Sequence, residues 1–163
     1  MPTKDSILYV LDLAESISKG YLSDLTAADL LLRPVPGMNH IAWQLGHLLL
    51  TEQRFVEMIK PGSSPALPPD FEAGHGRQSF GDDEPGHHLA PADYLRLMQA
   101  QRDATKAVLA GLGEDELAAP GPEGVRQMAP TVGSTFLLIG THVLMHVGQY
   151  VPVRRKLGKP IAM

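Results

Sequence analysis

The sequence predicts an all-α protein in which residues 1–163 form one domain, a four-helix bundle. Three observations support this fold class. Four long segments place apolar residues at helical spacing, and no segment convincingly alternates apolar and polar residues as a half-buried strand does. Glycine and proline separate the segments, with long loops expected between helices two and three and between helices three and four. The chain is also long enough to bury one sizeable core.

The first helix is predicted to begin at Asp5 or Ser6, because either side chain can cap it. Its apolar positions follow the helical period: Ile7, Val10, Leu11, Ala14 and Ile17. Gly20 predicts a break or bend, and residues 26–29 are typical of the start of a short second segment. The prolines and glycine within residues 34–37 then require a turn.

Three further long helices are predicted, over about residues 39–59, 91–112 and 131–157. The middle one has a single face formed by Leu95, Met98, Arg102, Thr105, Val108 and Leu109. Residues 61–90 are rich in Pro, Gly, Asp and His and show no sustained periodicity, so they are expected to form a long loop. A structureless loop of that length is usually functional or mobile. A second loop, with three prolines, precedes the last helix.

The charge of the chain argues against a nucleic-acid partner. It has 14 basic and 18 acidic side chains, a formal charge of −4, and no long basic run. The densest basic stretch, residues 154–156, lies at the end of a predicted helix, where cations interact favourably with the helix dipole.

The absence of cysteine excludes a disulfide scaffold, a thiolate metal site and a cysteine nucleophile. Acidic residues interrupt the N-terminal apolar stretch before a signal-peptide core could form. No apolar run reaches the ~18 residues that span a bilayer. We therefore expect a soluble cytoplasmic protein without a membrane partner.

Three histidines lie on apolar faces of two predicted core helices. His142 and His146 lie one turn apart on one stripe of the last helix, and His47 lies on the stripe of the second long helix. Histidines on apolar faces are often satisfied core residues. However, burying three imidazoles without a shared partner would cost several kcal/mol, so a metal site is the alternative interpretation.

Imidazole ligands favour Zn²⁺, Ni²⁺ and other late first-row ions. Three protein ligands would leave coordination positions open for water or substrate, as in catalytic rather than structural sites. The pattern differs from the HExxH motif of zinc peptidases because Val143 takes the place of the glutamate. A peptidase is therefore not expected.

The last helix is apolar or small around its whole circumference. Such a helix is buried on more than one side. In a bundle this small, a second copy of the chain would most simply cover the other side. We therefore predict a homodimer that uses the back of this helix.

Four residues near the triad are candidates for catalysis. Arg54, on the same stripe as His47, could bind a carboxylate or phosphate of a cofactor, or could form an ordinary ion pair. Gln149 could bond to a bound ligand or pack as a helix amide. His40 could act as a base at the rim of the site, or could be a surface or turn-capping residue, and Tyr150 could reach the site or pack outside it.

Four other aromatic residues have weaker links to the site. Trp43 is expected in the core, where it could form a cavity wall. His75, His87 and His88 belong to the long loop and could line the cavity mouth, although exposed loop histidines are common.

Residues 36–47 read PGMNHIAWQLGH, and residues 142–149 read HVLMHVGQ. These two segments resemble the N-IAW-LGH helix and the HxxxHxGQ helix of the DinB/YfiT-like superfamily of bacterial four-helix bundles. Residues 31–34, LLRP, also fit. The resemblance covers nearly the whole chain, although the loops at 61–90 and 113–130 carry little of it.

The resemblance implies an up-down-down-up bundle, commonly dimeric, with one divalent ion held by His47, His142 and His146. Better-understood relatives transfer or isomerise small-molecule substrates with low-molecular-weight thiols such as bacillithiol or mycothiol. The leading hypothesis is therefore a metal-dependent S-transferase whose thiol comes from a bound cofactor. The alternatives are a metal-dependent hydrolase that activates water and a non-enzymatic, stress-related metal-binding bundle.

Overall fold

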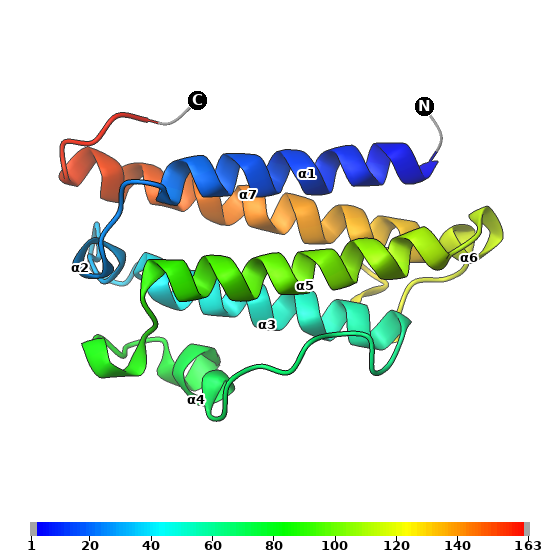
Figure 1. The fold of residues 1–163 in the computed structure, drawn as a ribbon, viewed down its shortest axis with the longest axis horizontal. Helices are drawn as coiled ribbons and strands as arrows, with labels where there is room; N and C mark the ends of the chain where they lie inside the picture. Colours follow the sequence, from blue (N-terminus) through cyan, green and yellow to red (C-terminus); the bar gives the residue numbers. More distant parts are fainter. Residues whose placement is uncertain (1–2, 162–163) are drawn as a thin grey trace.

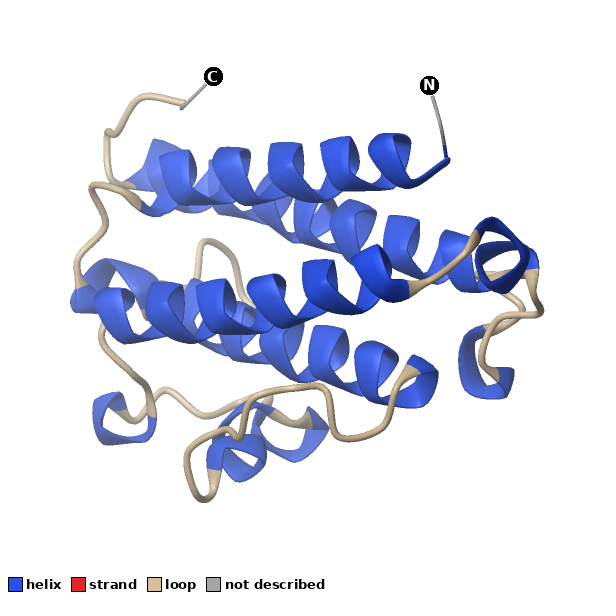
Figure 2. Cartoon of the chain, turned by 45° about the vertical axis from the view of Figure 1, so that its right-hand side comes forward, coloured by secondary structure: helices blue, strands red, loops and turns tan. Residues whose placement is uncertain are grey.

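The computed structural model describes residues 3–161 and shows an up-down-down-up bundle of four long helices. The helices are α1 (Thr3–Leu22), α3 (Ile41–Ile59), α5 (Pro91–Gly111) and α7 (Val132–Lys156). Helices α1 and α7 run in one direction, and α3 and α5 run in the other (Figure 1). The described residues contain no β-strand (Figure 2), only an isolated bridge between Pro120 and Thr131. The predicted fold class is confirmed.

Each long helix packs against two others. Helix α1 contacts α7 and α5, and α3 contacts α5 and α7. Two hydrophobic clusters fill the space between them. Val143 belongs to one cluster and Ile139, one turn earlier on α7, belongs to the other. His142 therefore lies near the middle of the bundle, where the two clusters meet.

The ends of α1 differ slightly from expectation, whereas α2 (Ala27–Leu30) begins where the sequence predicts. Helix α1 begins at Thr3 and continues past Gly20 to Leu22, so the predicted break falls two residues early. The predicted second segment is present. Its capping box joins Thr26 and Asp29, each side chain bonding to the backbone N–H of the other residue.

Residues 60–90 return the chain from the end of α3 to the start of α5, because these two helices are parallel (Figure 1). The expectation of a loop without secondary structure is wrong in part. The segment contains α4 (Phe71–His75), η1 (Arg77–Ser79) and η2 (Pro85–His87). Helix α6 (Glu114–Ala118) and η3 (Glu123–Val125) similarly interrupt the second loop.

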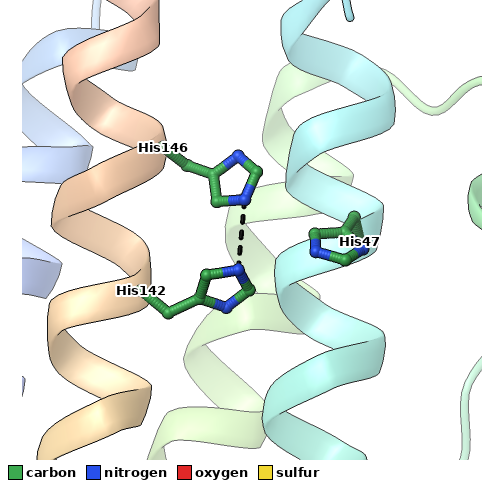
Figure 3. Close-up of side chains that lie close together, drawn as sticks. All are labelled: His47, His142 and His146. Carbon is green, nitrogen blue, oxygen red and sulfur yellow. Dashed lines mark hydrogen bonds between the residues drawn. The ribbon is translucent and has the colours of Figure 1, made fainter. Parts of the chain in front are cut away.

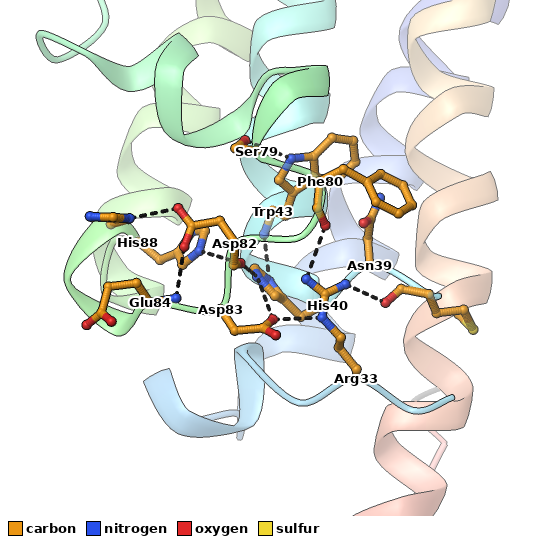
Figure 4. A network of polar contacts seen from close by, with 12 residues as sticks. Arg33, Asn39, His40, Trp43, Ser79, Phe80, Asp82, Asp83, Glu84 and His88 are labelled. Carbon is orange, nitrogen blue, oxygen red and sulfur yellow. Dashed lines mark hydrogen bonds and ion pairs between the residues drawn. The ribbon is translucent and has the colours of Figure 1, made fainter. Parts of the chain in front are cut away.

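Polar side chains at the N-terminal end of α3 and in the segment before it attach this returning segment to the bundle (Figure 4). Trp43 Nε1 lies 3.1 Å from Gly76 O and 3.2 Å from Ser79 Oγ. His40 Nε2 lies 2.8 Å from the Asp82 carbonyl oxygen, and Arg33 Nε donates to Asp83 over 2.7 Å. These contacts join residues 30 to 50 positions apart in the chain, so helical periodicity does not reveal them.

Helix α7 is long and apolar enough, by length and composition alone, to cross a membrane. Its buried large apolar residues, including Phe136 and Val147, belong to the two hydrophobic clusters of the bundle. A core helix passes the same test of length and composition. The basic stretch at its end, residues 154–156, is not entirely exposed to solvent. Arg154 is buried and pairs with Asp24 over 2.6 Å.

Candidate metal centre

The structure brings His47 from α3 together with His142 and His146 from α7 (Figure 3). One ring nitrogen from each histidine lies within 4.8 Å of the other two. The Nε2 atoms of His142 and His146 are 3.2 Å apart. Because residues four apart in a helix share one face, α7 presents both rings toward α3. The predicted convergence of these three side chains is therefore present in the fold.

The spacing of the nitrogens fits a single ion. Two imidazole nitrogens bound at about 2.0–2.1 Å in tetrahedral geometry lie about 3.3 Å apart. The pair on α7 already has this separation. His47 makes no hydrogen bond with any described residue, and one of its ring nitrogens lies within 4.8 Å of the pair while the ring stacks on Trp43. The three rings fit a late first-row divalent ion, whose preferred ligands include imidazole.

The environment keeps the three imidazoles neutral. Burial, with a smaller contribution from His47, lowers the pKa of His142 to about 4. Burial, followed by the charges of His142 and His47, lowers the pKa of His146 to about 3. Burial also lowers the pKa of His47, aided by the positive charges of Arg77 and Arg54. Neutral imidazole is the form that binds metal, so at pH 7 the site need not lose protons first.

Gln44 is a contact that the sequence analysis missed. Its Oε1 lies 2.9 Å from Nδ1 of His146, on the side of the ring away from His142. The available signal was a polar amide within the apolar run 41–46, close to the helical stripe that carries His47. The side chain is fully buried.

Trp43 forms a wall beside the site. Its ring stacks on His47 with 5.0 Å between ring centroids and 7° between planes. It is buried, and its Nε1 bonds to the segment that contains η1. Both roles considered from the sequence, core packing and wall, therefore apply to this residue.

His75 is a structural residue next to the site and does not lie at an exposed cavity mouth. It is 2% exposed, and its ring nitrogens lie 2.9 Å from Phe71 O and 2.6 Å from the Tyr94 hydroxyl. The ring lies directly over Gly46, the residue before His47 in α3. A Cβ atom on Gly46 would come within 2.0 Å of the His75 ring. Glycine is therefore needed here for close approach.

Replacing Gly46 with Ala is expected to lower the free energy of unfolding by about 1–3 kcal/mol, because overpacking displaces His75 from its two hydrogen bonds. Gly111 at the end of α5 provides the control, since a Cβ there meets nothing within 4 Å. Gly111→Ala should be neutral or stabilising by up to about 1 kcal/mol. Urea unfolding followed by circular dichroism measures both. Equal effects of the two substitutions would contradict this packing.

The other loop histidines lie apart from the triad. His87 is exposed, and its Nδ1 lies 2.7 Å from Asp82. The His88 ring packs against His40 and His75, with centroid distances of 4.6 Å and 5.5 Å. Neither ring has a ring contact with the triad among the described residues.

The structure places the four candidate catalytic residues as follows. His40 caps α3, its Nδ1 accepting from Trp43 N, and it is buried rather than on the surface. Arg54 is exposed and lies 3.7 Å from Glu72, as in the ordinary ion-pair interpretation. Gln149 is half-buried and makes no hydrogen bond with the described residues.

Tyr150 packs inside the bundle. Its side chain is fully buried in a hydrophobic cluster, and its hydroxyl has no hydrogen-bond partner among the described residues. Burial raises its pKa. No ring contact or hydrogen bond links it to the three histidines in residues 3–161.

The fold and the site together define an all-α bundle with a three-histidine cluster that could hold a metal ion. The sequence-family model of the DinB superfamily matches residues 11–150, a span that includes all three histidines. The chain therefore belongs to the DinB superfamily. This confirms the family indicated by the two sequence motifs.

One solved structure with a similar fold is YfiT from Bacillus subtilis, described as a probable metal-dependent hydrolase with an unusual four-helix bundle topology. The two chains share 18% identity over 96% of this chain and 89% of the other, with a TM-score of 0.65. At this identity the similarity concerns the fold alone. No curated protein matches the chain significantly.

Proposed function

We propose that the protein is a metal-dependent enzyme that activates a small nucleophile. The observation that carries this proposal is the convergence of three neutral imidazoles, His47, His142 and His146, from two facing helices. An all-nitrogen donor set favours zinc or nickel. A divalent ion held there would lower the pKa of a bound thiol or water and supply a nucleophile at neutral pH.

The first candidate reaction is S-transfer from a low-molecular-weight thiol to a small electrophile. The thiol must come from outside, because the chain has no cysteine. In this transfer the thiol loses its proton, its sulfur bonds to the electrophilic carbon, and the leaving group departs with the electron pair. Arg54 and Arg77 are exposed, and their charges act on His47. They would attract a thiol that carries a carboxylate.

Segment 76–79 places Arg77 near the site. The residues on both sides of Arg77, Gly76 and Ser79, bond to Trp43, and Trp43 stacks on His47. Arg77 has no ion-pair partner among the described residues. We therefore propose that Arg77 joins Arg54 in binding the cofactor.

The second candidate is hydrolysis by activated water, the activity attributed to YfiT. The triad would serve this reaction equally well. However, the metal-binding group in the described residues contains no carboxylate that could act as a base. Glu52 lines the narrow space beside His142, but Arg102 and Thr105 hold it at 2.9 Å and 2.7 Å. We rank transfer first because the exposed charges of Arg54 and Arg77 suit a thiol that carries a carboxylate.

The experiment uses untagged protein loaded with Co²⁺, to which mercaptoacetate or 2-mercaptoethanol is added. Thiol binding at the ion should produce a sulfur-to-cobalt absorption band. Arg77→Gln should weaken the binding of mercaptoacetate but not that of uncharged 2-mercaptoethanol, because only mercaptoacetate has a carboxylate. Ester turnover without thiol, and no such band, would favour the hydrolase. The absence of both the band and ester turnover would favour a non-enzymatic bundle and would overturn the proposal.

We also propose that the protein is a homodimer through the outer face of α7. Leu137 and Met145, two turns apart, are exposed apolar residues on this face. Met145→Lys should convert a dimer of twice 17.6 kDa to a monomer, because a buried lysine would lack a partner. Light scattering after size exclusion measures the mass. Met128→Lys, in an exposed residue outside α7, is the control and should remain dimeric. A monomeric unmodified protein would contradict this proposal.

A further inference from the structure

We infer that Gln44 is a positioning residue for the metal centre: its amide oxygen fixes the ring of His146 so that Nε2 faces the other two histidines. This inference rests on the proposed metal-binding function and adds a residue that does not itself touch the ion.

The first step concerns the orientation of the Gln44 amide. Its Nε2 donates to the Asn39 carbonyl oxygen over 2.9 Å. Because a carbonyl can only accept, the NH₂ group must face Asn39, and Oε1 must face His146. The two ends of the amide are therefore distinguished by the hydrogen bonds themselves.

The second step concerns the tautomer of His146. Its Nδ1 lies 2.9 Å from Gln44 Oε1, and an amide oxygen cannot donate. Nδ1 must therefore carry the hydrogen. A neutral imidazole has only one N–H, so Nε2 is left with its lone pair. Nε2 is the atom that lies 3.2 Å from His142.

The third step concerns the geometry that results. Gln44 precedes His47 by three residues, so one stretch of α3 supplies both a candidate ligand and the orienting contact for a ligand on α7. Without the acceptor, the other tautomer, with hydrogen on Nε2, becomes available and cannot bind through that atom. Outer partners of this kind typically contribute 10–100-fold to metal affinity.

The test compares two substitutions at Gln44. Gln44→Leu removes the acceptor at similar size, and Gln44→Glu retains it; both variants lose the donor to the Asn39 carbonyl oxygen, so they differ in the acceptor. Zn²⁺ affinity is measured by competition with a chromophoric chelator. We expect the leucine variant to bind Zn²⁺ about 10–100-fold more weakly, and the glutamate variant to bind at least as tightly as the unmodified protein. Gln53→Leu on the same helix is the control, because Gln53 bonds to Pro65 O and should leave the affinity unchanged.

Nitrogen-15 NMR of the metal-free protein provides a readout that does not depend on metal. His146 should be the Nδ1–H tautomer in the unmodified and Gln44→Glu proteins and should lose this single form in Gln44→Leu. Tight Zn²⁺ binding by unmodified and leucine proteins alike, with the same tautomer, would overturn the role of Gln44 alone. An unmodified protein that binds no Zn²⁺ would overturn the proposed function and this role together. Should the leucine variant fail to fold, an Nε2–H tautomer in the unmodified protein would still overturn the inference.

Discussion

Replacing His146 with Ala is expected to reduce metal binding from one ion per chain to background. His146 is the most buried of the three histidines and bonds to Gln44, so its ring occupies a fixed position in the site. Removing a direct ligand should weaken binding by more than the 10–100-fold attributed to an outer partner. Elemental analysis of dialysed, untagged protein measures the stoichiometry.

His87→Ala is the matched control for this substitution, because His87 is an exposed histidine outside the triad. It should retain one ion per chain. His142→Ala, at a half-buried position, should repeat the loss if the His146 variant folds poorly. One tightly held ion in either triad variant would contradict the assignment.

The pH dependence follows from the lowered pKa values. Protons compete with metal only as the pH falls toward the pKa of a ligand. With pKa values of about 4 for His142 and about 3 for His146, these two rings should stay available to metal at pH 5.5. At that pH most molecules of an unperturbed histidine, with a pKa of about 6.5, would be protonated.

Replacing Arg102 with Met is expected to lower the free energy of unfolding by about 3–5 kcal/mol. Arg102 and Glu52 form an ion pair at 2.9 Å, with side chains 5% and 8% exposed. Arg102 also donates to Leu11 O, and Thr105 donates to the second oxygen of Glu52. Removing the guanidinium leaves a buried carboxylate without its counter-charge. Chemical denaturation measures the loss.

The double variant Glu52→Met and Arg102→Met should recover much of this loss, because neither charge then remains buried. Arg96→Met is the surface control. Its pair with Asp93 is exposed and should contribute about 0–1 kcal/mol. A loss of unfolding free energy in Arg102→Met as small as that in Arg96→Met would contradict the buried ion pair.

The sign of the pH effect provides a second check on this pair. Burial raises the pKa of Glu52, and the charge of Arg102 opposes that rise. Without Arg102 the pKa should rise further, so the folded state binds a proton at a higher pH than the unfolded state does. The loss of unfolding free energy in Arg102→Met should therefore shrink as the pH falls through this raised pKa of Glu52. A loss that stays constant from pH 7 to pH 4 would contradict this explanation.

The sequence predicts much of the fold because helices carry a local signal. The period of apolar residues gives the four long helices, and capping residues such as Thr26 and Thr131 mark their starts. The histidine pair on α7 is visible for the same reason, since residues four apart share a face. His47 belongs to another helix, but it also lies on an apolar face, so its side chain could be expected to point into the same core.

The remaining contacts are not periodic, and the sequence predicts them poorly. His75 lies over Gly46 only because α4 packs against α3, and no spacing rule relates these two residues. Gln44 could be read as an ordinary packing amide until the partner helix is in place. Arg102 on an apolar stripe was a usable signal of a buried partner, but nothing local identified that partner as Glu52.

X-ray absorption spectroscopy of the zinc-loaded, untagged protein tests the central claim most directly, because it counts the imidazole rings on the ion. The arrangement of His47, His142 and His146 predicts three imidazole nitrogens at about 2.0–2.1 Å. The same sample of His146→Ala should show fewer imidazoles or no bound zinc. A spectrum of the unmodified protein with two or fewer imidazoles would contradict a single ion shared by the three rings.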